Sequence, residues 1–114
     1  MPDWVSKWGP VLAWAALIFT LSSIPGLGTG LGGWDVVLRK LAHAAEYAVL
    51  GLLLVRAIGH AWLSVALGIA YAASDELHQH FVPGREGALL DVLVDSVGVV
   101  AGVLVWRQFS RARH

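Results

Sequence analysis

Apolar residues are concentrated in four long stretches, separated by segments rich in glycine, proline and charged residues. The stretches cover residues 8–24, 41–58, 61–78 and 88–106. Each has about the 17 to 25 residues that a helix needs to cross the hydrocarbon core of a bilayer. The glycine-rich link at 25–37 is the one long loop; because the other links are short, consecutive helices should be antiparallel neighbours. The pattern predicts an all-α fold, a four-helix antiparallel transmembrane bundle that forms one domain over residues 1–114.

The first apolar stretch has an alternative interpretation as a cleaved signal peptide, because Lys7 precedes the apolar run 11–21. No cleavage site of the A-x-A type follows this run, whereas three further apolar stretches do. We therefore expect a retained helix. Pro10 is expected in its first turn, where a missing amide hydrogen does no harm.

Composition supports a membrane protein. Hydrophobic residues make up 57% of the chain and charged residues 14%, whereas soluble domains usually have about 25% charged residues. The formal net charge is zero, which argues against a nucleic-acid partner, since such binding needs a basic excess. Cysteine is absent, which excludes disulfides and thiolate chemistry. The six tryptophans suit helices that are anchored at two membrane interfaces.

Lysine and arginine near the helix ends predict the orientation of the bundle. The end that holds both termini carries Lys7, Arg56, Arg107, Arg111 and Arg113. The other end carries Arg39, Lys40 and Arg85. Because cytoplasmic flanks are richer in these residues, we expect both termini in the cytoplasm.

Ionisable residues gather at the opposite end of the predicted bundle, on three different helices. They are Arg39 and Lys40 just before the second stretch, His43 and Glu46 within it, Asp75, Glu76 and His78 in the third, Arg85 in the link, and Asp91 and Asp95 in the fourth. Antiparallel packing places all of them at one membrane face. Carboxylates inside a bilayer are costly, so we expect these side chains to face one another, a water-filled cleft or a ligand.

Spacings of three and four residues place these groups on the same helix faces as small residues. Asp91 and Asp95 are followed at that spacing by Gly98 and Gly102 in the fourth stretch. In the third stretch Ser64, Gly68 and Ala72 lead to Glu76 at the same spacing. Small residues let helix backbones approach closely in lipid. We therefore expect a tightly packed bundle that opens into a polar cleft.

Three kinds of chemistry stay open for such a cleft. Crowded carboxylates must hold a proton or a cation, so a divalent metal is one candidate. Its ligands would come from His43 and Glu46 in the second stretch and from Asp75, Glu76 and His78 in the third, although neither segment matches the metalloprotease pattern H-E-x-x-H. General acid–base or phosphoryl chemistry on a lipid headgroup is the second, and binding without turnover is the third. The candidate catalytic residues are His43, Glu46, Asp75, Glu76, His78 and Asp91. The candidate ligand-binding residues are Arg39, Lys40, Tyr47, Gln79, Arg85 and Asp95.

Three segments resemble the VanZ-like family of small bacterial membrane proteins. They read WAALIFTLSSIPG at 14–26, RKLAHAAEYAVLG at 39–51, and YAASDELHQHFVPGREGALLDVLVDSVGVVAG at 71–102. The positions that match the family signature are Lys40, His43, Glu46, Tyr47, Asp75, Glu76, His78, Gln79, Phe81, Pro83, Gly84, Arg85, Asp91 and Asp95. Asp95 departs from the asparagine that is frequent in the family, which argues against a mechanism that needs a neutral amide there.

The resemblance implies a multi-pass protein of the bacterial cytoplasmic membrane. The family takes its name from a member that gives low-level resistance to teicoplanin, a lipoglycopeptide, and it supplies no assigned catalytic role. We expect the cleft to bind the headgroup of an envelope lipid or cell-wall precursor, with Lys40 and Arg85 on its phosphate. A headgroup-modifying enzyme and a non-catalytic scaffold are the alternatives. The expected partners are membrane lipids or a lipid-linked or amphiphilic small molecule, and an oligomer is left open.

Overall fold

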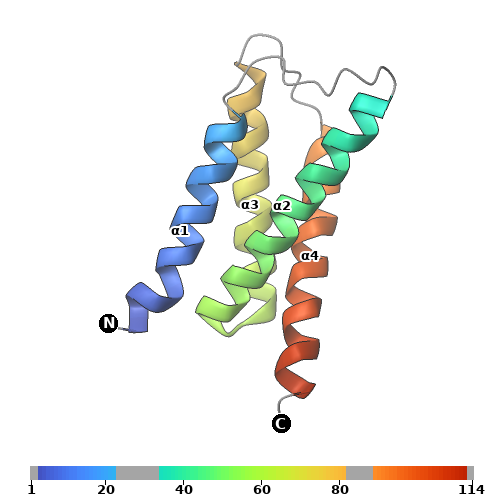
Figure 1. Ribbon diagram of the computed structural model, residues 1–114. Helices are drawn as coiled ribbons and strands as arrows, with labels where there is room; N and C mark the ends of the chain where they lie inside the picture. The colour runs from blue at the N-terminus through green and yellow to red at the C-terminus, as the bar shows by residue number, and fades with distance from the viewer. Residues whose placement is uncertain (1–2, 23–33, 82–88, 113–114) are drawn as a thin grey trace.

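The computed structural model describes residues 3–22, 34–81 and 89–112, and every regular element within them is an α-helix. The helices are α1 (Asp3–Ser22), α2 (Trp34–Ile58), α3 (Ala61–His80) and α4 (Leu89–Ala112). α1 and α3 run in one direction and α2 and α4 in the other, so the start of α1 and the finish of α4 share one end (Figure 1). We call this the terminal end. The opposite end, where α2 and α4 begin and α3 finishes, is the polar end.

The predicted all-α, four-helix antiparallel arrangement is confirmed, but the helices extend beyond the predicted apolar stretches. α2 begins at Trp34 rather than at residue 41, and α4 continues to Ala112 rather than to residue 106. Apolar patterning marks the part of a helix that suits lipid, whereas backbone hydrogen bonds continue into the polar turns beyond it. The extra turns of α2 carry Arg39 and Lys40.

Pro10 lies inside α1 and not in its first turn, because the helix already begins at Asp3. This corrects the expectation from sequence. A proline within a helix leaves the carbonyl four residues earlier, here that of Ser6, without its amide partner. Arg56 of α2 donates a hydrogen bond from Nη1 to the Ser6 carbonyl over 3.1 Å. Helix α2 thereby supplies the hydrogen bond that Pro10 removes.

The link between α2 and α3 consists of two residues with complementary roles. Gly59 has a φ of 76°, a left-handed conformation that favours glycine, and its amide donates to the Val55 carbonyl at 2.8 Å. His60 caps α3, because its Nδ1 accepts a hydrogen bond from the Leu63 amide at 3.1 Å. This tight link makes α2 and α3 antiparallel neighbours.

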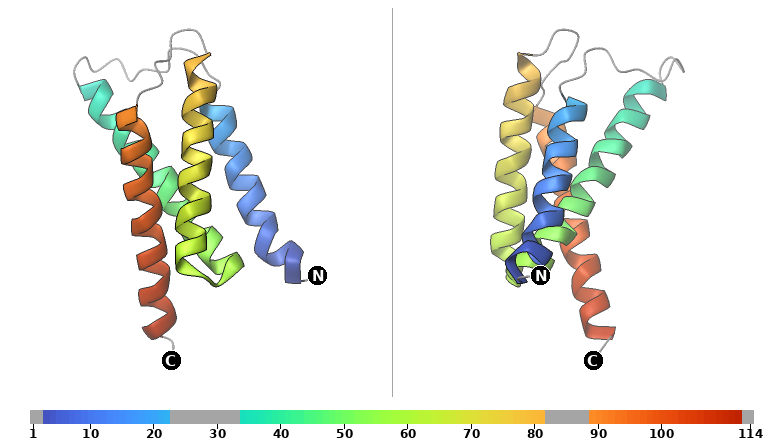
Figure 2. Two further views of the ribbon diagram at one scale, coloured as in Figure 1. Left: turned by 180° about the vertical axis from the view of Figure 1, so that it is seen from behind. Right: turned by 60° about the vertical axis from the view of Figure 1, so that its left-hand side comes forward.

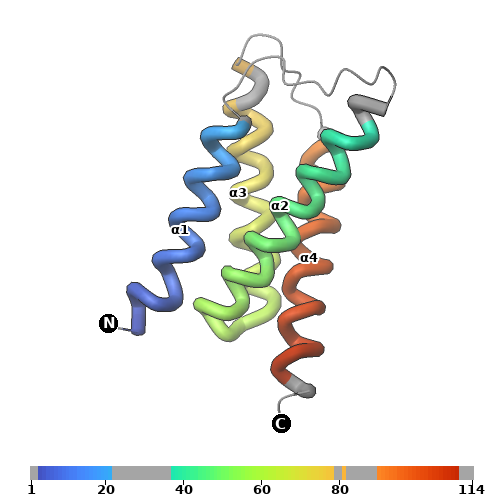
Figure 3. Tube along the Cα trace, in the orientation of Figure 1, coloured from blue at the N-terminus to red at the C-terminus, as the bar shows by residue number. Residues whose placement is uncertain are grey.

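Helix α2 crosses the bundle at a slant and packs most extensively against α4 (Figure 3). Two glycines of α4 allow the backbones to approach closely. A Cβ atom on Gly98 would collide with the carbonyl of Ala44, and one on Gly102 would collide with that of Ala48. The predicted role of these two glycines as a helix contact is confirmed.

Val99 of α4 lies where three helices meet, and it is completely buried. Gly51 of α2 faces its carbonyl, and a Cβ on Gly68 of α3 would come within 2.6 Å of its Cγ1. Ser64 and Ala72, on the same face of α3 as Gly68, are also fully buried. The small residues of α3 therefore lie on its packed face, where Gly68 lets α4 approach closely.

Helix α1 lies against α2 and α3 and, among the described residues, does not contact α4 (Figure 2). Two hydrogen bonds fix its position. Nε1 of Trp14 donates to the Glu46 carbonyl at 2.8 Å, and the Tyr71 hydroxyl donates to the Ala15 carbonyl. Aromatic side chains from α1 and α3 thus join α1 to the other helices through backbone carbonyls.

The molecule has an apolar exterior and polar groups in its interior. Large apolar side chains are exposed on every helix, among them Leu12, Leu41, Leu77 and Val97, each more than 60% exposed. Asp75 and Asp95, by contrast, are 2% and 3% exposed. Water-soluble proteins rarely bury acidic side chains so completely, and extensive exposed apolar surface marks contact with a membrane or a partner.

Two helices among the described residues are long and apolar enough to cross a membrane, over Asp3–Leu21 and Val37–Ile58. Length and composition alone give only a weak indication, since core helices of soluble proteins and signal sequences meet the same criteria. This finding does not test the predictions that all four helices cross the membrane and that both termini are cytoplasmic, which stay predictions.

Candidate functional site

The buried acids continue the packed face of their own helices. Asp75 lies three residues beyond the fully buried Ala72 on α3, and Asp95 lies four residues before the fully buried Val99 on α4. A step of three or four residues keeps side chains on one helix face. The contacts that pack α3 against α4 therefore direct both carboxylates into the interior, toward α2.

Tyr47 of α2 meets Asp75 in this interior. Its hydroxyl donates a hydrogen bond to Oδ2 of Asp75 at 3.0 Å, and the tyrosine side chain is completely buried. Hydrogen bonds to charged acceptors are stronger than those between neutral groups. Tyr47 thereby fixes the position of one carboxylate oxygen between α2 and α3.

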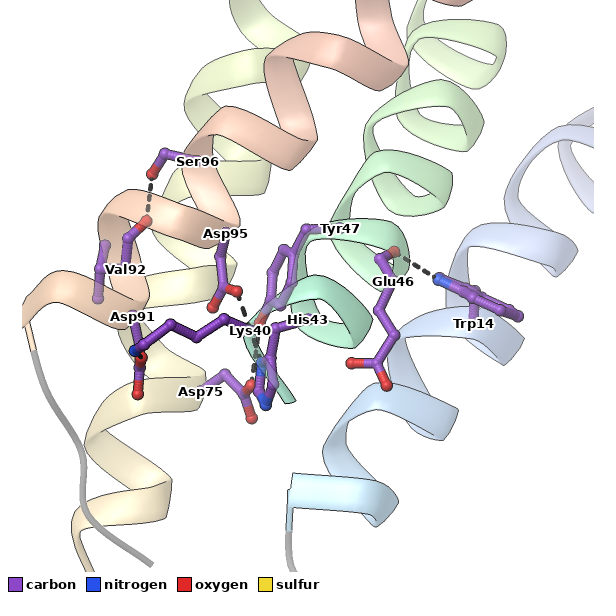
Figure 4. Close-up of polar contacts among 10 residues, drawn as sticks. All are labelled: Trp14, Lys40, His43, Glu46, Tyr47, Asp75, Asp91, Val92, Asp95 and Ser96. Carbon is purple, nitrogen blue, oxygen red and sulfur yellow. Dashed lines mark hydrogen bonds and ion pairs between the residues drawn. The ribbon is translucent and has the colours of Figure 1, made fainter. Parts of the chain in front are cut away.

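His43 lies one turn before Tyr47 on α2 and faces Asp95. Its Nδ1 is 3.5 Å from Oδ1 of Asp95, beyond the usual hydrogen-bond length of about 2.7–3.2 Å. Ligating atoms of His43, Asp75 and Asp95 all lie within 4.8 Å of one another. Figure 4 shows the three side chains converging from α2, α3 and α4. We call this group the His–Asp cluster.

A second charged contact lies one helical turn nearer the polar end. Nζ of Lys40 is 2.7 Å from Oδ1 of Asp91, and the two side chains are 32% and 25% exposed (Figure 4). Lys40 precedes His43 by three residues, and Asp91 precedes Asp95 by four. The ion pair therefore lies beside the His–Asp cluster, between the same two helices, and is more accessible.

Two of the predicted catalytic residues face α1 instead of the cluster. The carboxylate of Glu46 extends on the α1 side of α2, away from Asp95 (Figure 4). The ring of His78 stacks on Phe19 of α1, with 4.2 Å between centroids and 21° between planes. Both side chains are thus directed toward α1, whereas sequence grouped them with the carboxylates of α3 and α4.

The remaining predicted site residues lie on α2 and α3 or outside the described residues. Glu76 is half-buried on α3, and Arg39 is exposed on α2. The backbone of Gln79 belongs to α3, but its side chain is not among those described. Arg85, together with Pro83 and Gly84, lies outside the described residues. Its predicted contact with a phosphate stays a prediction.

Sequence reasoning did not assign the aromatic residues that hold α1 against the site. Trp14, Phe19 and Tyr71 are absent from the site predicted from sequence, yet each makes a specific contact between helices. The position of Trp14 and Phe19 in the half of α1 nearer the polar end is one feature of the sequence that could have indicated a place beside the site. Their partners, a carbonyl and an imidazole on other helices, could not be identified from α1 alone.

A comparison with protein families decides where the chain belongs. The family model described as VanZ/LLP1 matches residues 4–110, a range that includes nearly all of the four helices. The chain belongs to this family. The VanZ/LLP1 match extends over α2, α3 and α4, so every residue of the His–Asp cluster lies within it. No curated protein and no solved structure matches the chain.

Proposed function

We propose that this VanZ-like protein is an integral protein of the bacterial cytoplasmic membrane whose four helices all cross the bilayer. Exposed apolar side chains on α3 and α4, such as Leu77 and Val97, support this beyond the two helices that are long and apolar enough to cross a membrane. In the proposed orientation the terminal end is cytoplasmic. Lys7, Arg56 and Arg107 near that end agree with the excess of basic residues in cytoplasmic flanks.

The polar end of the bundle binds the headgroup of an envelope lipid or a cell-wall precursor. The observation that carries this proposal is the burial of Asp75 and Asp95 beside His43, inside a bundle with an apolar exterior. An apolar core would be more stable than one with buried ionisable groups. Intramembrane ionisable residues usually mark a ligand or ion site for this reason.

The chemistry of the headgroup follows from the charged residues nearest the polar end. Lys40 is partly exposed, and the neighbouring Arg39 is exposed on the same helix. Their cationic groups suit a phosphate, as Arg85 does in the prediction from sequence. A phosphate is common to phospholipids and to polyprenyl-phosphate-linked cell-wall precursors, and the acyl or prenyl chains would lie along the apolar exterior.

Native mass spectrometry of the protein released from bilayers tests this binding. Parallel samples contain phosphatidylethanolamine, phosphatidylglycerol or a polyprenyl phosphate at equal amounts. We expect one class to remain bound at one molecule per chain, and binding to fall at least about tenfold in Lys40→Met. The control is Asp3→Asn, an exposed acid at the terminal end. Equal, non-saturating adducts in all samples and variants would overturn the proposal.

We further propose that this binding gives tolerance to teicoplanin by occupying an envelope lipid or precursor; the resemblance to a family named for a teicoplanin-resistance member supports this. The test is teicoplanin susceptibility of a bacterial host that expresses either the wild type or Lys40→Met at equal abundance. We expect the wild type alone to raise the inhibitory concentration. Equal susceptibility of both strains and the empty host would remove the teicoplanin link and leave lipid binding unaffected.

An enzyme that acts on a phospholipid headgroup is a second candidate function. The contact of His43 with Asp95 favours it, since a carboxylate can orient an imidazole for general base catalysis. Incubation of the captured lipid with the protein, followed by mass analysis, separates the two functions. A headgroup modified by the wild type and unmodified by His43→Gln would establish turnover, whereas release of intact lipid by both supports binding alone.

A further inference from the structure

The composition of the His–Asp cluster suits a metal ion. One imidazole nitrogen and two carboxylates reach a common point from three helices, with their ligating atoms within 4.8 Å of one another. Imidazole and carboxylate are the ligands that zinc, iron and manganese share in proteins. Three protein ligands are also the number in zinc sites that keep one position open for water or substrate.

Two atoms of the cluster are buried without an ordinary hydrogen bond. Within the described part of the chain, neither Nδ1 of His43 nor Oδ1 of Asp95 has a hydrogen-bond partner. Asp95 is 3% exposed, so bulk water does not reach it freely. Buried polar atoms normally find a partner, and an exception calls for an explanation such as a bound ion. Figure 4 shows both side chains directed into the cluster.

The separation of these atoms agrees with shared coordination. Nδ1 of His43 and Oδ1 of Asp95 are 3.5 Å apart. Two ligands at about 2.0–2.1 Å from one tetrahedral ion are roughly 3.4 Å apart. The observed distance is therefore long for a hydrogen bond and close to that between two ligands of one metal.

The charge of the His–Asp cluster is a third reason to expect a metal ion there. Asp75 and Asp95 bring two carboxylates into an interior of low dielectric, where a divalent cation would neutralise them and leave the imidazole neutral. Lys40, the nearest lysine, is engaged by Asp91. The Tyr47 hydroxyl holds Oδ2 of Asp75, and such hydrogen bonds commonly orient the ligands of a metal.

We propose that His43, Asp75 and Asp95 bind one divalent transition-metal ion, of the zinc or manganese type, inside the helix bundle. Magnesium and calcium are poor candidates because they prefer shells made of oxygen alone. The ion neutralises the buried acids and ties α2, α3 and α4 together near the polar end. This proposal stands independently of headgroup binding.

Titration of the chelator-treated protein with Zn²⁺, Mn²⁺ or Mg²⁺, by calorimetry and native mass spectrometry, tests the site. We expect one Zn²⁺ or Mn²⁺ per chain and binding of Mg²⁺ at least tenfold weaker. Affinity should fall by at least about tenfold in Asp95→Asn and in His43→Gln, and by about tenfold in Tyr47→Phe, which removes only an outer hydrogen bond. Asp3→Asn is the control, since Asp3 is an exposed acid at the terminal end, away from the cluster.

Folding is measured separately, because a substitution at a buried residue can abolish metal binding by unfolding the protein. Each variant is compared by circular dichroism and by its thermal midpoint with and without the ion. Wild-type protein should gain thermal stability on adding the ion, and Asp3→Asn should gain as much. Absence of stoichiometric binding by the folded wild type, or equal affinity in wild type and folded Asp95→Asn, overturns the metal site. The lipid adducts in the same spectra report on headgroup binding independently.

Discussion

The hydroxyl of Tyr47 donates to Oδ2 of Asp75 across 3.0 Å, and the two residues are 0% and 2% exposed. This contact joins α2 to α3 at the level where α4 contributes Asp95. It therefore contributes both to helix packing and to the geometry of the His–Asp cluster, and the two contributions can be separated by experiment.

Tyr47→Phe should destabilise the fold by about 1–3 kcal/mol, since it removes the donor to a buried carboxylate and keeps the ring. Tyr71→Phe is the matched comparison. Tyr71 donates to a neutral backbone carbonyl and is only half-buried, so its loss should cost about 1 kcal/mol. Unfolding in mixed detergent micelles measures both. A loss for Tyr47→Phe no larger than that for Tyr71→Phe would contradict the special role of the Asp75 contact.

Gly102→Ala should separate α2 from α4, because the added methyl group collides with the rigid carbonyl of Ala48. The expected loss is about 1–3 kcal/mol, typical of overpacking. Gly9→Ala is the control, since a Cβ there meets no atom within 4 Å, and alanine favours a helix over glycine. Unfolding measurements should therefore show that glycine-to-alanine substitution lowers stability at position 102 and raises it at position 9. Equal effects at the two positions would exclude the close α2–α4 contact.

Arg56 and Pro10 should be energetically coupled through the Ser6 carbonyl. Arg56→Ala alone removes the hydrogen bond to that carbonyl, at a cost of about 1 kcal/mol. In the Pro10→Ala background the helix itself can supply the missing amide, so Arg56→Ala should cost less. A double-mutant cycle on unfolding measures the difference. Strictly additive effects would show that Arg56 does not compensate for the proline.

Lys40 and Asp91 should tolerate exchange better than removal of one partner. Lys40→Met leaves the Asp91 carboxylate without its cation in a partly buried position, and we expect a loss of about 1–3 kcal/mol. The exchange Lys40→Asp with Asp91→Lys should recover at least half of that loss. Unfolding and expression level report the result, and no recovery would indicate that each residue acts through other neighbours.

Single cysteines test the four crossings, since the natural sequence has none. Phe81→Cys lies at the polar end and Gln108→Cys near the terminal end, both at exposed positions. A membrane-impermeant thiol reagent added to intact cells should label position 81 and reach position 108 only after permeabilisation. Labelling of both from outside would contradict the crossing of α4 and the proposed orientation.

The topology and the convergence of residues at one end could be predicted from sequence because both follow from periodicity. Short links impose antiparallel neighbours, and steps of three or four residues place Asp95 on the same face as Gly98 and Gly102. Once those glycines direct α4 against α2, the carboxylate must enter the interior. On α3 the stripe of Ser64, Gly68 and Ala72 predicts Glu76 at the packed face, whereas the structure buries Asp75 more deeply and leaves Glu76 half-buried.

The division of the polar residues between two sides of α2 could not be predicted. His43 and Glu46 are three residues apart, which separates them by only about 60° around the helix. Whether both face one site depends on how α1 packs, and the apolar sequence of α1 leaves its rotation open. The structure directs His43 toward Asp95 and Glu46 toward α1. The contact between Phe19 and His78 depends on the same packing.

Photo-crosslinking with a phospholipid that carries its reactive group in the headgroup tests the central claim most directly. The protein is labelled in bilayers, digested and mapped by mass spectrometry, with an acyl-chain probe as reference. We predict an excess of headgroup labelling at the polar end over the terminal end, and loss of that excess in Lys40→Met. Equal headgroup labelling of the two ends, unchanged by the substitution, would contradict a headgroup site beside the His–Asp cluster.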